Sequence, residues 1–258
     1  MHYRIDVKLI IPKDCPVYSM KRKNRGKCVV FSHKKFPDIN LYRNETVYDE
    51  NAIRETFSAL GFEVVIHKDL YFIDIIHIID KLKDEDHSDS DCICFFVLTH
   101  GDSKGAIYAS DGSFYSINII WQLFTADSCP SLAGKPKLFF VQACKGSEGD
   151  EGIEGTEDTY TDSNEPSFII PTRADFLYCF STSEGYYAFR ENNGSWYIQT
   201  LCRVINEYWQ HCDMIKMLTI TSRIVATEYL SQHNNSSKNE KKQMPFFVST
   251  LIRNLYFT

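Results

Sequence analysis

A chain of 258 residues in which 43% are hydrophobic and 14% aromatic can bury a substantial core, and this excludes a largely disordered protein. The 34 acidic residues outnumber the 28 basic ones, and the net charge of −6 excludes a general electrostatic attraction to nucleic acid or to anionic membranes. No run approaches the roughly 18 apolar residues that span a bilayer, and the first residues lack the apolar core of a signal peptide. We therefore expect an intracellular, cytoplasmic protein.

The nine cysteines form no Cys-x-x-Cys pair. Cys92 and Cys94 lie two positions apart in an apolar run, so both side chains would face the same side of a strand. An odd number of cysteines in an intracellular chain is typical of reduced packing residues. We expect neither a disulfide framework nor a metal site, and no cofactor.

Short apolar strands alternate with helical patterns over the first half of the chain, which is typical of an α/β fold. Gly61 ends a predicted helix, and Asp111-Gly112 is a turn signal that predicts a hairpin. The run 92–99 is apolar almost throughout, as in a strand covered on both faces of a parallel sheet. The predicted elements, in chain order, are strand 28–31, helix 49–60, strand 62–66, helix 72–82, strand 93–99, strands 106–109 and 113–115, helix 117–124 and strand 138–141.

The composition changes sharply between residues 145 and 166, where eight acidic residues stand among Gly, Ser and Thr without apolar periodicity. We expect an exposed, flexible linker that interrupts the core without dividing it. The α/β pattern resumes after this linker. The predicted elements that follow are strand 176–180, helices 196–209 and 214–230, a polar loop at 231–240 and strand 246–249.

His100 and Cys144 each follow a predicted buried strand. In open α/β sheets the reactive groups gather at the carboxyl ends of the strands, so a base and a thiol would meet at one sheet edge. An imidazole near a thiol can take its proton and later protonate a leaving amine. Gly101 would let a backbone N–H approach the substrate, where it and the N–H of Cys144 would bind an oxyanion. On these residues alone, a buried structural cysteine beside a strand-end histidine is the competing interpretation.

The residues around the cysteine decide between these interpretations. The segment Gln142-Ala143-Cys144-Lys145-Gly146, with a histidine upstream, matches the local signature of caspases. From about residue 27 to the C-terminus the chain resembles the caspase family. The resemblance implies an α/β fold with a mostly parallel six-stranded sheet flanked by helices on both faces. Further segments that agree with the family are Arg43-Asn44-Glu45-Thr46, 132–138, 174–178, Gly185-Tyr186-Tyr187 and Gly194-Ser195-Trp196.

What the resemblance implies about activity is a cysteine endopeptidase that cuts proteins after aspartate. In this role Cys144 is the nucleophile, His100 the proton shuttle, and the backbone N–H groups of Gly101 and Cys144 form the oxyanion hole. The carbonyl of Leu41 would orient the histidine. Guanidinium forks suit a carboxylate, and the implied aspartate pocket consists of Arg43, Gln142 and Arg190. The implied neighbouring apolar subsites are lined by Tyr187, Phe189 and Trp196.

Several residues depart from the family pattern. Lys145 follows the nucleophile where arginine is usual, and Glu45 places a carboxylate beside the pocket arginine, where it would compete with substrate. Glu191 would repel an acidic side chain four positions before the cut. Phe189 stands where many relatives have tryptophan, and the loop at 231–240 lacks the expected aromatics. We therefore predict cleavage after aspartate with a preference distinct from Asp-Glu-Val-Asp.

The resemblance also divides the chain. Its parts would be an N-terminal segment or short prodomain at 1–26, a large catalytic subunit at 27–162 that ends in the acidic linker at about 145–166, and a small subunit at 163–258. Asp162, which a small residue follows, is the predicted maturation site, and Asp158 is the second candidate. The short first segment, without a helical adaptor module, favours an executioner-type enzyme of apoptosis.

Partners also follow from the resemblance. The strand at 246–250 would pair with its twin in a homodimer and give a continuous sheet. The expected partners are protein substrates with aspartate before the scissile bond and protein inhibitors of apoptosis. One alternative is a pseudo-protease that serves as a decoy or dimer partner, with Lys145 and Glu45 as its marks. Another is a related peptidase that cuts after Arg or Lys, which would need an acidic pocket.

Overall fold

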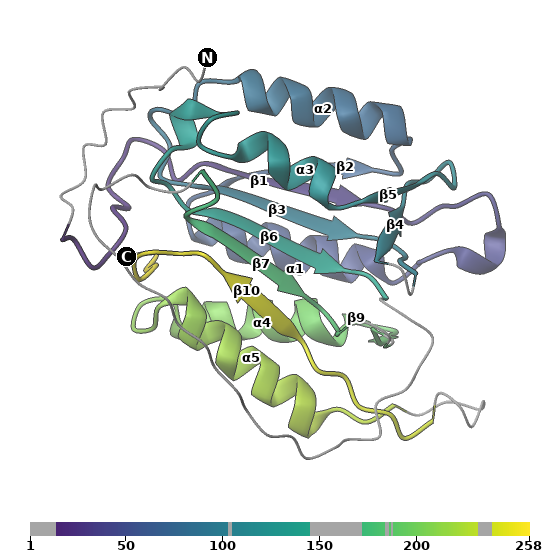
Figure 1. Cartoon of the computed structure of the whole chain (residues 1–258). Coiled ribbons are helices and arrows are strands. Elements are labelled where there is room, and N and C mark those ends of the chain that lie inside the picture. Colours follow the sequence, from purple (N-terminus) through teal and green to yellow (C-terminus); the bar gives the residue numbers. More distant parts are fainter. Residues whose placement is uncertain (1–13, 103–104, 145–171, 184–185, 187, 232–238) are drawn as a thin grey trace, which may run out of the picture.

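Six strands form one twisted sheet in the computed structural model, which describes residues 14–102, 105–144, 172–183, 186, 188–231 and 239–258. The strand order is β10-β7-β6-β3-β1-β2, and every neighbouring pair is parallel except β10 with β7 (Figure 1). This confirms the expected mostly parallel six-stranded sheet. The strands are β1 (Lys27–Ser32), β2 (Glu63–Lys68), β3 (Ile93–Leu98), β6 (Lys137–Gln142), β7 (Phe176–Phe180) and β10 (Phe246–Ser249).

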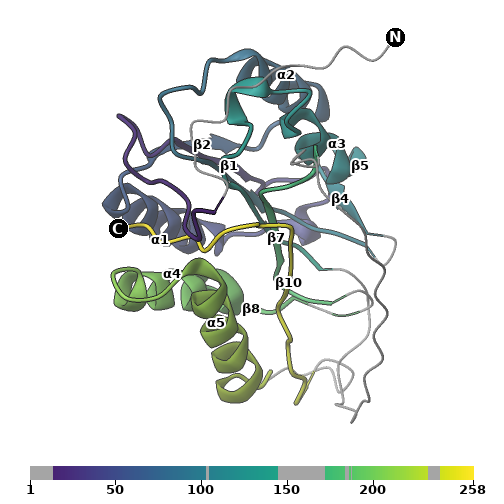
Figure 2. The same cartoon turned by 60° about the vertical axis from the view of Figure 1, so that its left-hand side comes forward.

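Helices cover both faces of the sheet, as expected (Figures 1 and 2). On one face lie α1 (Thr46–Ala59), α4 (Trp196–Tyr208) and α5 (Met214–Glu228), and they share one apolar core with the sheet. On the other face lie α2 (Phe72–Asp84) and the short α3 (Asn118–Trp121), which share a second core. Two small hairpins, β4 (Ala106–Tyr108) with β5 (Phe114–Ser116) and β8 (Arg190–Glu191) with β9 (Gly194–Ser195), stand at the carboxyl end of the parallel strands.

The central strands β3 and β6 explain why one sheet supports two cores. All residues of both strands are buried, and their side chains alternate between the two faces. Phe95 stacks on Phe139 at a centroid distance of 5.0 Å on one face, and Phe96 stacks on Phe140 at 4.6 Å on the other. The parallel register that pairs these residues also fixes which residues leave the sheet side by side at its carboxyl end.

All nine cysteines lie in described residues and are free thiols. Cys92 and Cys94 face the same core, as the strand spacing predicts, and are completely buried. Burial raises the pKa of both thiols well above the ordinary value, so they remain protonated packing groups. Cys144 differs from these two because it is partly exposed.

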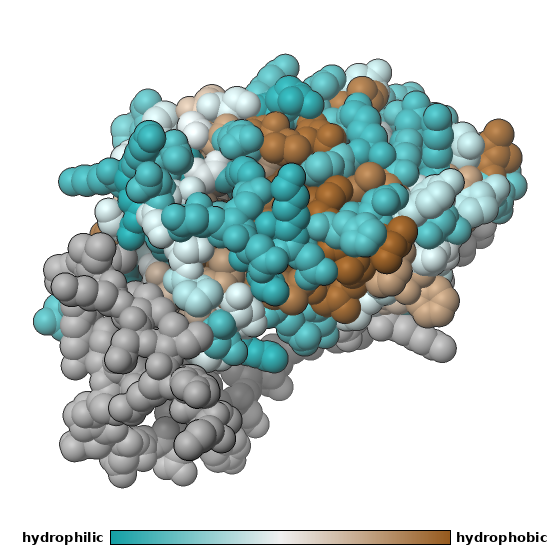
Figure 3. Space-filling view, turned by 90° about the horizontal axis from the view of Figure 1, so that it is seen from above, coloured by the Kyte–Doolittle hydropathy of each residue, from teal (hydrophilic) through white to brown (hydrophobic). Residues whose placement is uncertain are grey.

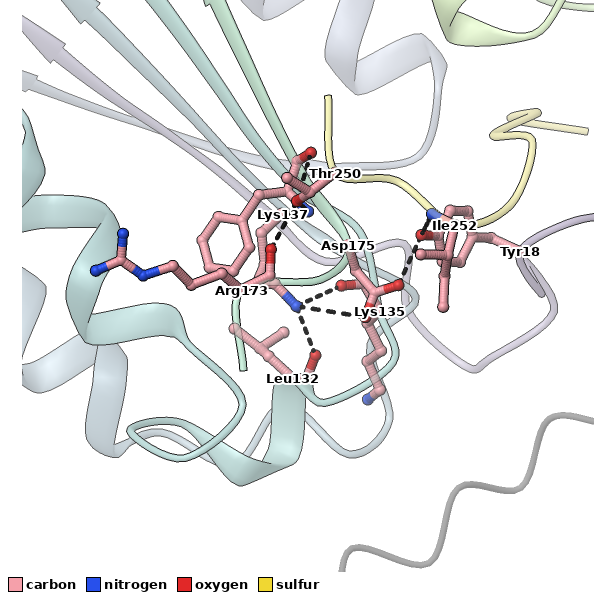
Figure 4. A network of polar contacts seen from close by, with 9 residues as sticks. Tyr18, Leu132, Lys135, Lys137, Arg173, Asp175, Thr250 and Ile252 are labelled. Atoms are coloured by element: carbon pink, nitrogen blue, oxygen red, sulfur yellow. Dashed lines mark hydrogen bonds and ion pairs between the residues drawn. The ribbon is translucent and has the colours of Figure 1, made fainter. Parts of the chain in front are cut away.

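A buried polar cluster closes the amino end of the sheet (Figure 4). The ammonium group of Lys137 donates to the carbonyls of Lys135 (2.9 Å) and Leu132 (3.2 Å) and lies 4.0 Å from the carboxylate of Asp175. That carboxylate also accepts a hydrogen bond of 2.7 Å from the hydroxyl of Tyr18. Burial lowers the pKa of Lys137 to about 8. The cluster therefore joins residues on both sides of the interruption at 145–171.

The predicted element boundaries agree with the structure to within a few residues, and strands 176–180 and 246–249 coincide with β7 and β10. The helix predicted over 117–124 is divided into α3 and a 3-10 turn at Gln122–Phe124. The acidic stretch at 145–166 lies outside the described residues. In the described part of the chain, no helix is long and apolar enough to cross a membrane.

The surface over α2 is mainly hydrophilic, with patches of apolar side chains between the polar ones (Figure 3). Ile73 in α2 is 55% exposed and Phe114 in β5 is 71% exposed. Single exposed apolar residues of this kind are normal on soluble proteins. The candidate site residues His100 and Cys144 lie elsewhere, at the carboxyl end of the sheet.

Candidate active site

His100 and Cys144 occupy equivalent places at the carboxyl end of the sheet. Leu98 ends β3 and pairs with Gln142, which ends β6, so each of the two residues stands two positions beyond a strand end in the same register. The N–H of Thr99 donates to the carbonyl of Gln142 at 3.1 Å, which keeps the two chain segments together one step beyond the sheet. The parallel register thus brings together the base and the thiol that the sequence singled out.

Gly101 lies where the two segments approach most closely. A Cβ atom at this position would stand 2.2 Å from the carbonyl oxygen of Cys144, a distance that no side chain tolerates. Gly101 also forms a bridge with Ile107, and that bridge is closed by the bonds Tyr108 N–H to His100 O (3.1 Å) and Asp102 N–H to Ala106 O (3.0 Å). The N–H of Gly101 takes no part in these two bonds.

The imidazole of His100 is held by a backbone carbonyl and an aromatic ring. Its Nε2 lies 2.7 Å from the carbonyl oxygen of Leu41, so Nε2 carries the proton and Nδ1 is the free acceptor. The ring of Phe36 packs against it at a centroid distance of 4.9 Å. Burial, together with the positive charges of Arg43 and Arg190, lowers the pKa of His100 to about 4, whereas the bond to Leu41 acts in the opposite direction. The imidazole is therefore neutral at pH 7.

The thiol of Cys144 contacts the chain beside β8. The N–H of Ala188 lies 3.5 Å from Sγ, and Sγ lies 3.7 Å from the carbonyl oxygen of the same residue. Among the described contacts, no hydrogen bond joins this thiol to His100. Catalytic hydrogen bonds are often long in ligand-free enzymes.

Arg43 is buried, and no carboxylate of the described residues forms an ion pair with it. Its side chain is 2% exposed, its Nη1 donates to the carbonyl of His33 at 3.1 Å, and its Nε has no hydrogen-bond partner in the described part of the chain. Burial, together with the charge of Arg190, lowers the pKa of Arg43 to about 10, so the guanidinium stays charged at pH 7. Gln142 is 3% exposed, and its Oε1 also lacks a partner among the described residues. Buried polar groups without partners are typical of an unfilled polar pocket.

Arg190 forms the exposed side of this region. Its Nε lies 3.5 Å from the carboxylate of Glu45, and both side chains are about one third exposed. The sequence predicts that Glu45 lies near Arg43 and competes with substrate; its ion pair is with Arg190, the other arginine predicted for the pocket. Such a partly exposed pair is weak and readily exchanged for another carboxylate.

An aromatic stack stands beside β8. The ring of Trp196 lies between those of Phe189 (4.9 Å) and Tyr229 (5.0 Å), and the indole N–H donates to the carboxylate of Glu191 at 2.8 Å. Trp196 is 3% exposed, so its ring lies within the wall of the site and offers little surface to a ligand. Phe189 is more exposed and faces the same stack. Tyr187, the third residue predicted for these subsites, lies outside the described residues, as does Asp162.

Three residues near the site were not predicted from the sequence. Asp49 in α1 is 2% exposed, and its carboxylate accepts from the N–H of Ser195 (2.9 Å) and from the amide of Gln199 (2.8 Å), which fixes β9. Tyr229 completes the aromatic stack, and Gln243 contacts the backbone before β8. No local signal marks these residues, because each contact joins distant parts of the chain.

The described part of the chain contains no group of three or more His, Cys, Asp or Glu side chains arranged to hold a metal ion. A thiol, a neutral imidazole and a buried cation lie together at one sheet edge. These are the parts of a cysteine hydrolase that recognises an anionic group.

Comparison with known proteins defines this class further. The family model described as the caspase domain matches residues 25–256. The chain is 40% identical over 247 residues to caspase-7 of Gallus gallus, which covers 93% of this chain and 79% of that protein. It is 38% identical over 264 residues to caspase drICE of Drosophila melanogaster, covering 99% and 77% respectively. The crystal structure of caspase-1 from Spodoptera frugiperda superposes with a TM-score of 0.88 at 36% identity, covering 97% of this chain and 98% of that one. The chain belongs to the caspase family and is a cysteine endopeptidase.

Proposed function

We propose that this endopeptidase cleaves proteins after aspartate, with Cys144 as nucleophile and His100 as general base and acid. The free Nδ1 of the neutral imidazole accepts the thiol proton as the sulfur attacks the scissile carbonyl. The N–H groups of Gly101 and Cys144 bind the oxyanion that forms. The imidazolium then protonates the leaving amine, and water hydrolyses the thioester with His100 again as the base.

Aspartate specificity is supported most directly by the buried, carboxylate-free guanidinium of Arg43. A substrate carboxylate would supply the acceptors that Nε lacks, and Arg190 would exchange Glu45 for the same carboxylate. A substrate without that charge would leave a buried cation unpaired, which costs several kcal/mol. Gln142 completes the pocket through its amide, and Phe189 and Trp196 form the neighbouring apolar wall.

The test is hydrolysis of Asp-terminated and Arg-terminated tetrapeptide amides by the purified protein and by Cys144→Ala. We expect turnover of the Asp peptide alone, and none by the variant. Turnover of the Arg peptide would overturn the specificity, and turnover by Cys144→Ala would overturn the assignment of the nucleophile. No turnover by the wild-type chain cut at Asp162 would favour a pseudo-protease.

The fourth substrate position is expected to disfavour acidic side chains. Glu191 lies at the outer end of the aromatic stack, where its carboxylate accepts from the indole of Trp196. An acidic substrate residue there would be repelled by this charge. The enzyme would thus differ from one that prefers Asp-Glu-Val-Asp, and a substrate-library profile dominated by aspartate at this position would refute the proposal.

Activation is proposed to occur by cleavage after Asp162, which would divide the chain into a large subunit (27–162) and a small subunit (163–258) behind an N-terminal segment (1–26). The acidic composition of 145–166 supports an accessible linker. A precursor with Asp162→Ala should stay uncut at that bond when incubated with active enzyme. Cleavage only after Asp158 would move the site to the second candidate.

Dimerisation through β10 completes the proposal. This strand is at the edge of the sheet, and Val248 on it is 49% exposed. An unpaired apolar edge is normally covered, and a second copy would continue the sheet. Sedimentation of the purified protein should give a dimer, and Val248→Lys should shift it to monomer.

By the resemblance, the enzyme is an executioner of apoptosis that acts in the cytoplasm and meets protein inhibitors of apoptosis.

A further inference from the structure

Gln243 is buried three residues before β10 and uses both ends of its amide. Gln243 is 1% exposed. Its Oε1 accepts a hydrogen bond of 2.6 Å from the N–H of Phe189, and its Nε2 donates one of 2.8 Å to the carbonyl of Ser181. Each partner is a backbone group, and Gln243 is 54 residues from Phe189 and 62 from Ser181 in the sequence.

Both backbone partners belong to the active site. Phe189 directly precedes Arg190 in β8, where the proposed substrate strand would pair. Ser181 directly follows β7, and its hydroxyl donates to the carbonyl of Ala143 at 3.2 Å, next to Cys144. A series of hydrogen bonds therefore runs from Phe189, beside β8, through Gln243 and Ser181 to Ala143, the residue before the proposed nucleophile.

We propose that Gln243 is a positioning residue that sets the substrate strand relative to the nucleophile. The inference rests on the proposed roles of Cys144 and Arg190. Only a side chain with an acceptor at one end and a donor at the other makes both bonds. Displacing β8 by even about 1 Å would misplace the scissile carbonyl relative to Sγ, and such errors cost about 100-fold in rate.

The chemistry of the amide gives the proposal a test that a merely structural role would not pass. In Gln243→Glu the new carboxyl accepts from the N–H of Phe189 in either state, but it donates to the carbonyl of Ser181 only when protonated. Burial raises the pKa of such a carboxyl above its ordinary value of about 4.3. The variant should therefore lose its function as pH rises. Among the described residues, the ionisable side chains within two positions of the four bonded residues are Cys144, Cys179, Arg190, Glu191, Lys241 and Lys242.

The experiment measures kcat and KM on the Asp-terminated peptide between pH 5 and 8 for wild type, Gln243→Glu, Gln243→Leu and a control, Gln210→Glu, at an exposed glutamine beyond α4. Active-site titration with a thiol-directed Asp-containing inhibitor normalises each rate to folded enzyme. The ratio of kcat/KM for Gln243→Glu to wild type should fall from near unity at pH 5 to about 0.01 at pH 8. Gln243→Leu should be about 100-fold impaired at every pH, and the control ratio should stay flat.

A flat ratio for Gln243→Glu would overturn the proposal even if Gln243→Leu did not fold. Activity of titrated Gln243→Leu within about threefold of wild type would also overturn it, because both bonds are then dispensable. Failure of the proposed function gives a different result, since the wild-type enzyme itself would then not turn over the Asp peptide.

Discussion

Two buried cations stand at opposite ends of the same sheet, and they are partnered differently. At the amino end, Lys137 contacts the carbonyls of Leu132 and Lys135, has the carboxylate of Asp175 at 4.0 Å, and lies over the ring of Phe176. At the carboxyl end, Arg43 donates to one carbonyl, and its Nε has no partner among the described residues. The first site is complete within the described residues, whereas the second forms no ion pair with any of them.

This difference separates a structural charge from a binding charge. A buried ion is tolerated when its partners replace water, and the network around Lys137 does this. Burial and the charge of Arg190 lower the pKa of Arg43 to about 10, so its charged form is less stable here than in water. Burial alone does not separate these two cations; the unfilled hydrogen-bonding capacity of Arg43, at the carboxyl end of the sheet beside the predicted site, does.

Arg43→Met should produce the largest effect. Removing the pocket cation should lower kcat/KM on an Asp peptide by about 10³-fold, equivalent to about 4 kcal/mol, because the substrate carboxylate loses its desolvated partner. The free energy of unfolding should change little, since no internal carboxylate is left unpaired. Arg54→Met, at an exposed position of α1, is the control for both measurements. A large loss of stability with activity retained would reverse the assignment of the two cations.

Lys137→Met should show the opposite behaviour. It leaves the buried carboxylate of Asp175 without its cation, so the free energy of unfolding should fall by about 3–5 kcal/mol. The kcat of the protein that remains folded should match wild type. Urea unfolding of Lys137→Met and of Lys81→Met, at an exposed lysine of α2, provides the comparison. Equal stability of the two variants would show that the amino-end cluster does not need its cation.

The pKa of His100 should report filling of the pocket. The positive charges of Arg43 and Arg190 help to hold this pKa near 4, so a bound carboxylate that offsets them should raise it. NMR titration of Cys144→Ala can follow the imidazole, with His211, which is exposed, as internal control. An Asp peptide should raise the pKa of His100 and an Asn peptide should not. Activity requires neutral His100, so it should fall as pH drops through this pKa. A pKa near 6.5 in the free enzyme would contradict the assignment.

Glu191→Gln should have the smallest effect. The new amide oxygen keeps the bond to the indole of Trp196, but the negative charge is removed. Acceptance of aspartate at the fourth substrate position, relative to leucine, should improve about fivefold, as expected for a partly screened charge worth about 1 kcal/mol. Competing peptide pairs measured in one reaction give this ratio directly. An unchanged ratio would mean that Glu191 does not face the substrate.

The sequence predicts the sheet well and the site in part. The strands can be recognised from the sequence because they are apolar runs between polar turns, and β7 and β10 therefore match their predicted bounds. The helix α1 begins three residues earlier than predicted, at Thr46, because Val47 and Tyr48 are exposed and blur its apolar pattern.

Some site residues can likewise be predicted from the sequence and others cannot. His100 and Cys144 follow from their strand-end positions, but Arg43 was identified only through the family resemblance, since an isolated arginine carries no local signal. Asp49 and Gln243 were missed because their roles depend on contacts with chain segments that only the fold brings near. Long-range polar contacts of this kind have no periodicity to read.

The most direct test of the unfilled Arg43 site is the discrimination between aspartate and its uncharged isostere. We would measure kcat/KM of the wild-type enzyme on two peptides that differ only in Asp or Asn before the scissile bond, with Cys144→Ala as the blank. We expect the enzyme to prefer Asp by at least about 10³-fold, because Asn leaves the buried guanidinium of Arg43 unpaired. Equal hydrolysis of both peptides would contradict it.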